Sequence, residues 1–167
     1  QQRLVAGMLD RDNLLAIIRT FTLFSTNDKG EIIKVVGRYQ QFRAVKLAVK
    51  RLLEGKTQRD RSGIIWHTQG SGKSLTMMFM VREMYRHASL SNWKVVFVTD
   101  RVQLEDQLTE TSQSIGFSVK VADSIKTLKT LLGTDSSDLV MAMIHKFREG
   151  DLKETFPELN TCPNTKK

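Results

Sequence analysis

The stretch GIIWHTQGSGKSLTMMFMVREMYRH, residues 63–87, decides the fold of this chain. It opens with a hydrophobic run, Gly63–Trp66, passes through a turn rich in small residues and ends in a long, mainly apolar segment. The opening run predicts a buried strand, and the segment from Lys73 to His87 predicts a helix. A glycine-rich turn between a strand and a helix is the arrangement in which backbone N–H groups bind phosphate.

The turn ends like a Walker A loop, whose usual form is GxxxxGK followed by Ser or Thr. His67 occupies the place of the first glycine, so the match is incomplete. In the phosphate-binding interpretation, Lys73 reaches the β and γ phosphates of ATP and Ser74 holds Mg²⁺. The alternative is a plain strand-to-helix turn whose lysine faces water. The residues that we expect to bind nucleotide in this turn are Gly70, Ser71, Gly72, Lys73 and Ser74.

Strand and helix signals alternate on both sides of the turn. The strands that we expect elsewhere are 21–25 and 31–36, joined as a hairpin, and 94–99, 117–121 and 138–144. The helices that we expect are 14–18, 39–54, 102–114 and 124–132, with Gly55 as a C-terminal cap and a loop over 56–62. Strands that alternate with helices favour a parallel sheet wrapped by helices.

Length and composition indicate one ordinary globular lobe. The chain has 167 residues, of which 40% are hydrophobic and 26% charged. It contains no apolar run of about 18 residues that would span a bilayer, so we expect a cytoplasmic protein with no membrane partner. The single Cys162 can form neither an internal disulfide nor a cysteine-based zinc site. We expect Trp66 and Trp93 to be core or edge aromatics.

Basic residues gather in one part of the chain. The net charge is +8, and between Arg38 and Arg61 eight basic residues stand against two acidic ones. Arg43, Lys46 and Lys50 fall on one arc of the helix expected there. Such a block suits a polyanion such as nucleic acid, although a solvated helix face explains the charge equally well.

The order of the motifs adds a resemblance to a known family. The runs RYQQFRAVKLAV, IIWHTQGSGKSLTMMFM and VVFVTDRVQLEDQL, followed by a strand leading to HKF, resemble the motor region of the restriction (R) subunit of type I restriction enzymes. That subunit is a superfamily 2 helicase-like translocase. The resemblance implies an α/β fold: a RecA-like P-loop lobe with a mainly parallel sheet flanked by helices. It also implies that residues 1–37 form a helix and hairpin linker after an upstream nuclease domain, and that 38–167 form an incomplete first motor lobe.

The resemblance also implies roles for residues outside the turn. Gln41, with Arg38 beside it, matches the glutamine with which such motors recognise adenine; the alternative is a polar cap on the helix. Thr99 and Arg101 match a block that contacts the DNA backbone, but Thr99 can equally cap a helix. The residues that the resemblance assigns to DNA are Thr99, Arg101, Gln107 and Lys146.

The implied activity belongs to the complete subunit, an ATP-dependent type I site-specific deoxyribonuclease. Its cofactors would be ATP and Mg²⁺, and its partners double-stranded DNA and the modification and specificity subunits. This chain contains no Asp followed by Glu, the carboxylate pair that positions Mg²⁺ and water, so we expect it to bind nucleotide without hydrolysing it. Two alternatives stay open: another superfamily 2 helicase or translocase, and a non-catalytic nucleic-acid-binding module.

Overall fold

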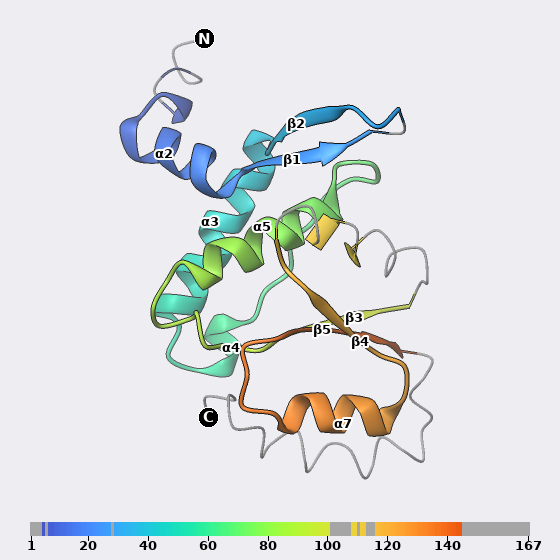
Figure 1. Ribbon diagram of the computed structural model, residues 1–167. Helices are drawn as coiled ribbons and strands as arrows, with labels where there is room; N and C mark the ends of the chain where they lie inside the picture. Colours follow the sequence, from blue (N-terminus) through green and yellow to red (C-terminus); the bar gives the residue numbers. More distant parts are fainter. Residues whose placement is uncertain are drawn as a thin grey trace. The chain divides into compact units, whose positions relative to one another are not determined.

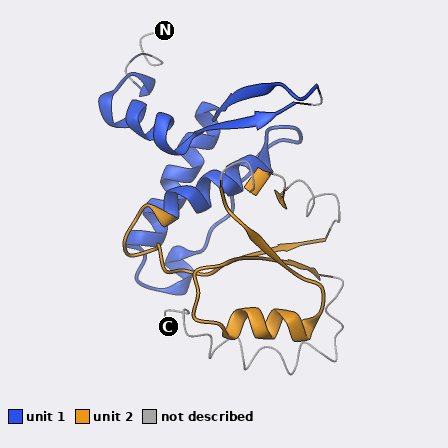
Figure 2. Cartoon of the chain, viewed as in Figure 1, with its two compact units in different colours: residues 1–84 blue, residues 85–167 orange. Residues whose placement is uncertain are grey.

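The chain folds into two compact units, residues 1–84 and 85–167, shown in Figure 1 and coloured by unit in Figure 2. The computed structural model describes residues 5, 7–27, 29–100, 108–109, 111–112 and 116–144. The first unit contains the glycine-rich turn of residues 67–74, and the second contains a parallel sheet.

The first unit begins with a capped helix and a hairpin. Helix α2, Arg11–Thr20, starts at Asp10, whose carboxylate accepts hydrogen bonds from the backbone N–H groups of Asp12 and Asn13. Strands β1, Thr22–Thr26, and β2, Ile32–Val36, pair antiparallel. The helix and hairpin predicted from the sequence are both confirmed.

Two helices and an aromatic cluster form the core of this unit. Helix α3 spans Tyr39–Glu54, and helix α5 spans Lys73–Tyr85, so that its last residue opens the second unit. Phe21, just after α2, is fully buried, with its ring centroid 4.9 Å from that of Phe42 on α3 and 5.2 Å from that of Phe79 on α5. The three rings therefore join α3 and α5 to the start of the hairpin.

Two local predictions between α3 and α5 are wrong. The expected loop over 56–62 contains a one-turn helix, α4, Gln58–Arg61, because Thr57 and Asp60 cap each other's backbone N–H groups at 3.1 and 2.9 Å. The expected strand Gly63–Trp66 is absent. Residues 62–68 have no regular structure, and Ile64 and Trp66 are 93% and 87% exposed. A hydrophobic run forms a strand only where a partner backbone pairs with it, and no described strand pairs with this one.

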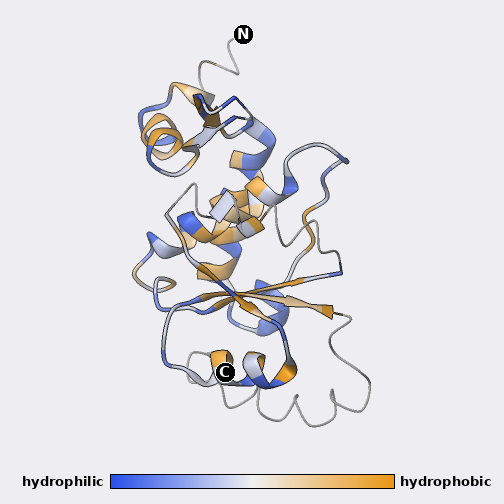
Figure 3. Cartoon of the chain, turned by 45° about the vertical axis from the view of Figure 1, so that its right-hand side comes forward, coloured by the Kyte–Doolittle hydropathy of each residue, from blue (hydrophilic) through white to orange (hydrophobic). Residues whose placement is uncertain are grey.

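The second unit is a parallel sheet with a helix on one face. Strands β3, Val95–Thr99, β4, Val119–Ala122, and β5, Leu139–Met143, pair in the order β3-β5-β4. The central strand β5 is buried along its whole length, and Figure 3 shows the sheet as mainly hydrophobic. A strand buried on both faces must be apolar throughout, which explains why LVMAM does not alternate.

Helix α7, Ile125–Gly133, connects β4 to β5 and packs on the sheet. Its Leu128 and Leu132 form a buried cluster with Ala122, Val140 and Ala142. The ammonium of Lys94, just before β3, donates to the backbone carbonyls of Leu131 and Thr134 at the end of α7. A cation there satisfies the carbonyls that the helix itself leaves without donors.

The predicted α/β class is confirmed: a parallel sheet flanked by helices, with a helix and hairpin at the start of the chain. Observed and predicted elements differ by one to three residues at most ends. Most of the helix expected over 102–114 lies outside the described residues. None of the described helices is both long and apolar enough to cross a membrane.

A carboxylate before β5 should make the stability of the second unit depend on pH. The Lys120 ammonium, 2.8 Å from the Asp138 carboxylate, and the Ser136 hydroxyl both donate to it and lower its pKa from 3.8. A lowered folded-state pKa stabilises the protein above the unfolded-state pKa, and this stability is lost as pH falls through the folded value. We expect Asp138→Asn to lower the free energy of unfolding by about 0.2–1 kcal/mol at neutral pH, as for other exposed ion pairs.

Denaturant unfolding of wild type and Asp138→Asn at about pH 7 and about pH 2 checks this expectation, because the difference should disappear in acid. Asp135→Asn, which changes an exposed carboxylate three residues earlier, serves as the control. A difference of the same size at both pH values would contradict the role given to Asp138.

Candidate functional site

The turn before α5 has a backbone that only glycine adopts without strain. Gly70 and Gly72 have φ angles of 74° and 79°, in the left-handed region. Between them, the backbone N–H and the hydroxyl of Ser71 both donate to the carbonyl oxygen of Thr68, at 3.3 and 2.6 Å. The turn therefore closes on itself immediately before the first turn of the helix.

Lys73 is the first residue of α5, and its side chain folds back over the turn. The ammonium donates to the carbonyl oxygens of His67 and Thr68, at 3.0 and 2.9 Å. Both contacts are exposed and neither partner carries a full charge, so a phosphate oxygen could replace them with stronger, charge-assisted bonds. The first α5 hydrogen bond runs from Thr76 N–H to Gly72 O at 3.0 Å, which leaves the preceding N–H groups without helical acceptors.

Ser74, the residue expected to bind Mg²⁺, is the second residue of α5 and is partly buried. In the part of the chain that the structure describes, no group of three or more His, Cys, Asp or Glu side chains could hold a metal. A single hydroxyl is nevertheless compatible with Mg²⁺, which usually takes few protein ligands and completes its shell with phosphate oxygens and water.

Gln41 links the start of α3 to the turn. Its side chain is almost completely buried, and its Oε1 accepts from the backbone N–H of Arg38 at 2.8 Å, which caps the helix. Its Nε2 donates to the carbonyl oxygens of Ser71 and Gly72 at 3.3 and 3.0 Å. The amide therefore caps the helix and also holds the turn of Gly70–Gly72, a contact that the sequence did not reveal.

The contact with Gln41 gives Gly72 a second reason to be glycine. A Cβ at this position would lie 2.7 Å from the Gln41 Nε2, inside any normal contact distance. At Gly70, by contrast, a Cβ would have no atom within 4 Å, so the backbone there faces open space. The turn is thus held from one side and open on the other, which fits a ligand as large as a phosphate chain.

Of the other expected site residues, the structure describes some and leaves others outside the described ranges. Arg38 is exposed and precedes α3 as its N-cap. Thr99 is the last residue of β3 and is 5% exposed, in the second unit. Arg101, Gln107 and Lys146 lie outside the described residues. Of the expected nucleotide contacts, the structure brings Gln41 together with Ser71 and Gly72.

Part of the basic block has structural partners. The Lys46 ammonium lies 2.7 Å from the buried carboxylate of Glu83 on α5, although 41% of the Lys46 side chain is exposed. Arg51 donates to the carbonyl of Asp60, and Arg61 donates to that of Gly55. Hydrogen bonds from Thr57 lower the pKa of the Asp60 carboxyl.

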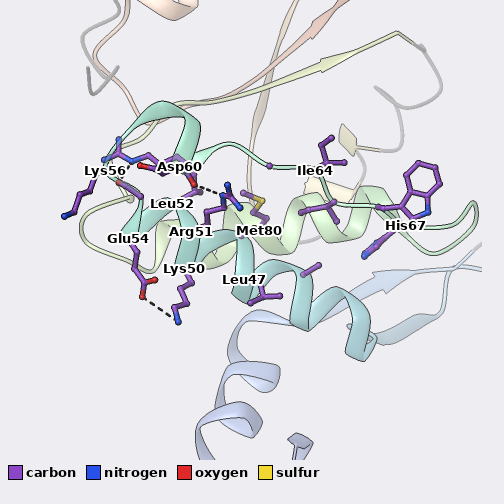
Figure 4. Close-up of a pocket in the computed structure, with 17 residues that line it drawn as sticks. Leu47, Lys50, Arg51, Leu52, Glu54, Lys56, Asp60, Ile64, His67 and Met80 are labelled. Carbon is purple, nitrogen blue, oxygen red and sulfur yellow. Dashed lines mark hydrogen bonds and ion pairs between the residues drawn. The ribbon is translucent and has the colours of Figure 1, made fainter.

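Several residues of the basic block line an open groove. Figure 4 shows Lys50, Arg51 and Lys56 around a groove of about 1020 Å³ beside the C-terminal half of α3. Lys50 makes only a loose 3.8 Å pair with Glu54, and both side chains are 67% exposed. Lys50 and Lys56 are therefore exposed in the groove, where a ligand could contact them.

Glu83 is the main residue that sequence reasoning missed. It is 3% exposed and contacts both Lys46 and the hydroxyl of Thr20. The signal in the sequence was an acidic residue seven positions after Thr76 and four after Phe79, on a side of the helix that is otherwise buried.

Comparison with known proteins agrees with this geometry. A sequence profile of the SWI2/SNF2 ATPase family matches residues 40–165, which include Gln41 and the whole turn. The matched region covers most of the chain.

The individual relatives are type I restriction enzyme endonuclease subunits. The chain is 34% identical over 96% of its length to the MjaIXP type I restriction enzyme endonuclease subunit of Methanocaldococcus jannaschii. It is 32% identical over 98% of its length to the HindI endonuclease subunit of Haemophilus influenzae. The chain spans only 15% and 16% of these two relatives. It therefore belongs to the SWI2/SNF2 ATPase family and is homologous to a short region of type I restriction enzyme endonuclease subunits.

Proposed function

We propose that the chain is the ATP-binding part of the motor of a type I restriction endonuclease subunit. The observation that carries this proposal is the turn of Gly70–Gly72, held by Gln41 on one side and open on the other, with Lys73 at the start of α5. The homology to type I endonuclease subunits supports it. In this proposal residues 1–37 are the linker and 38–167 the motor lobe of a cytoplasmic enzyme.

The turn would hold ATP through its phosphates. Backbone N–H groups of Gly70–Ser74 would donate to phosphate oxygens, Lys73 would exchange its two carbonyl contacts for the β and γ phosphates, and Ser74 would bind Mg²⁺. The bound nucleotide supplies a high-energy phosphoanhydride. The chain contains no Asp-Glu pair, so we assign to it nucleotide binding and assign hydrolysis to the complete subunit.

The complete subunit would use ATP hydrolysis to translocate double-stranded DNA and to cleave it, together with modification and specificity subunits. Within this chain, Thr99, Arg101, Gln107 and Lys146 stay predictions as DNA contacts. Three exposed cations add to this set: Lys50 and Lys56, which line the open groove beside α3, and Arg59 on α4.

Replacing Lys73 tests nucleotide binding directly. Lys73→Ala removes a charged donor, and hydrogen bonds to charged groups are worth about 1.5–3 kcal/mol, so we expect ATP affinity to fall about 10- to 150-fold. Titration calorimetry with Mg²⁺ and a non-hydrolysable ATP analogue measures the change. Lys34→Ala, at an exposed lysine on β2, should bind like wild type. Equal affinity of Lys73→Ala and wild type would exclude the phosphate-binding role and favour a nucleic-acid-binding module.

Replacing Gln41 distinguishes adenine recognition from positioning of the turn. If the amide recognises adenine, Gln41→Ala should reduce the preference for ATP over GTP about tenfold, as expected for a lost pair of base contacts. If the amide only holds the turn, both nucleotides lose affinity equally, because the turn touches only phosphates. Competition binding of the two nucleotides measures the ratio. The matched control is Gln40→Ala, at the exposed neighbouring glutamine on α3.

The basic groove predicts salt-sensitive DNA binding. Each lysine or arginine that contacts a phosphate contributes about 0.9 to the slope of log affinity against log salt concentration. We therefore expect the triple variant Lys50→Gln, Lys56→Gln, Arg59→Gln to lower this slope by about 2–3. Fluorescence anisotropy with a short DNA duplex at several salt concentrations measures it. A triple variant at the exposed Lys29, Lys34 and Lys126 controls for net charge, and an equal loss in both variants would leave the groove without a specific role.

A further inference from the structure

The first unit buries a carboxylate that the proposed ATP site does not use. Glu83, near the end of α5, has 4% of its side chain exposed. Its Oε1 accepts from the Lys46 ammonium of α3 at 2.7 Å, and its Oε2 accepts from the Thr20 hydroxyl of α2 at 2.9 Å. One carboxylate thus joins three helices, α2, α3 and α5, which Figure 1 shows together in the first unit.

A second set of contacts reinforces the same junction. The Arg82 guanidinium, next to Glu83, donates to the backbone carbonyls of Thr22 and Thr20 at 2.8 and 3.4 Å. Phe21 lies between those two residues and packs on α5 through Phe79. Three consecutive residues at the entry to the hairpin are therefore fixed to α5 by charge, hydrogen bonds and ring packing.

The junction also holds the hairpin's exit close to the core. Gly37, which follows β2, is buried, and its N–H donates to the carbonyl of Phe21 at 2.7 Å. A Cβ at Gly37 would lie 3.0 Å from the Phe79 ring and 3.2 Å from the Phe21 Cβ. Both ends of the hairpin thus meet α5 at the same place, with no room for an added side chain.

The two helices that meet at Glu83 also meet at the nucleotide site. Helix α3 carries Gln41 five residues before Lys46, and α5 carries Lys73 ten residues before Glu83. At 1.5 Å per residue these separations are about 7.5 and 15 Å along rigid helices. If α3 shifts relative to α5 at the Gln41 contact, the contacts among Lys46, Glu83 and Thr20 therefore change as well.

We propose that Lys46, Glu83 and Thr20 form a coupling element through which nucleotide at the turn of Gly70–Gly72 changes the stability of residues 14–26, the end of α2 and strand β1. The Lys73 ammonium donates to the His67 and Thr68 carbonyls, and the Gln41 amide donates to those of Ser71 and Gly72. Phosphate binding would replace the two Lys73 contacts. It would also pull on the turn that the Gln41 amide holds. Packed helices pass such a change on because close-packed interiors deform little.

Lys46 and Thr20 are positioning residues in this proposal, since neither touches the turn. The proposal rests on nucleotide binding at the turn. It adds that nucleotide binding at the turn changes the stability of residues 14–26, which lie more than 40 residues away in sequence.

Hydrogen exchange with and without nucleotide tests the coupling. In the wild-type chain, saturating Mg²⁺ and a non-hydrolysable ATP analogue should slow exchange of the amides in residues 14–26 at least threefold. Thr20→Val keeps the shape and the Lys46–Glu83 pair but removes the hydroxyl that joins them to α2. It should bind the analogue within threefold of wild-type affinity and lose the nucleotide-dependent slowing.

Further variants separate coupling from damage to the fold. Lys46→Met should lose the slowing and Lys46→Arg should restore it, while Gln40→Met, on the exposed side of α3, should behave as wild type. If Lys46→Met does not fold, as judged by circular dichroism, Thr20→Val alone decides the outcome. Bound analogue without slowing in the wild type, or slowing retained in Thr20→Val, overturns the coupling and leaves ATP binding intact. Failure of the wild type to bind the analogue overturns both proposals.

Discussion

The hydrogen bonds between the Gln41 amide and the carbonyls of Ser71 and Gly72 are the constraint on which the site depends. They fix a left-handed glycine turn against the start of α3, and a Cβ at Gly72 would displace the amide from these contacts. The same amide also caps α3 through its Oε1. The start of α3 therefore places the Gln41 Nε2 donor against the turn of Gly70–Gly72. The start of α3 and the geometry of the glycine turn thus depend on the same side chain.

A second contact between α3 and α5 uses an ion pair in place of an amide: the Lys46 ammonium and the Glu83 carboxylate. Burying a carboxylate is costly unless it is paired and hydrogen-bonded, and Glu83 meets both conditions through Lys46 and Thr20. This cost favours one arrangement of α2, α3 and α5, because an arrangement that separates these groups leaves an unpaired charge in the core. Helices α3 and α5 are thus linked near the start of each helix through Gln41 and again through Lys46 and Glu83.

Sequence patterns predicted the elements with strong periodicity and the residues of the turn. The α3 bounds, the hairpin and the sheet strands followed from apolar spacing, and the Gly-Lys-Ser end of the turn identified the candidate site. Helix α4 was missed because one turn depends on the mutual capping of Thr57 and Asp60 and not on periodicity. The prediction of a strand over Gly63–Trp66 was wrong, because strand formation depends on pairing with another strand that is distant in sequence. The contact between Thr20 and Glu83 spans 63 positions, which no local pattern encodes.

The exposed apolar residues Ile64–Trp66 have a consequence for the behaviour of the isolated chain. Ile64 and Trp66 are almost fully in water, Ile65 is exposed as well, and no described strand pairs with them. An exposed apolar segment outside a sheet can pair with another chain. The isolated polypeptide should therefore tend to associate with itself through this segment as its concentration rises, and mild detergent or a charged substitution at Ile64 would keep it dispersed.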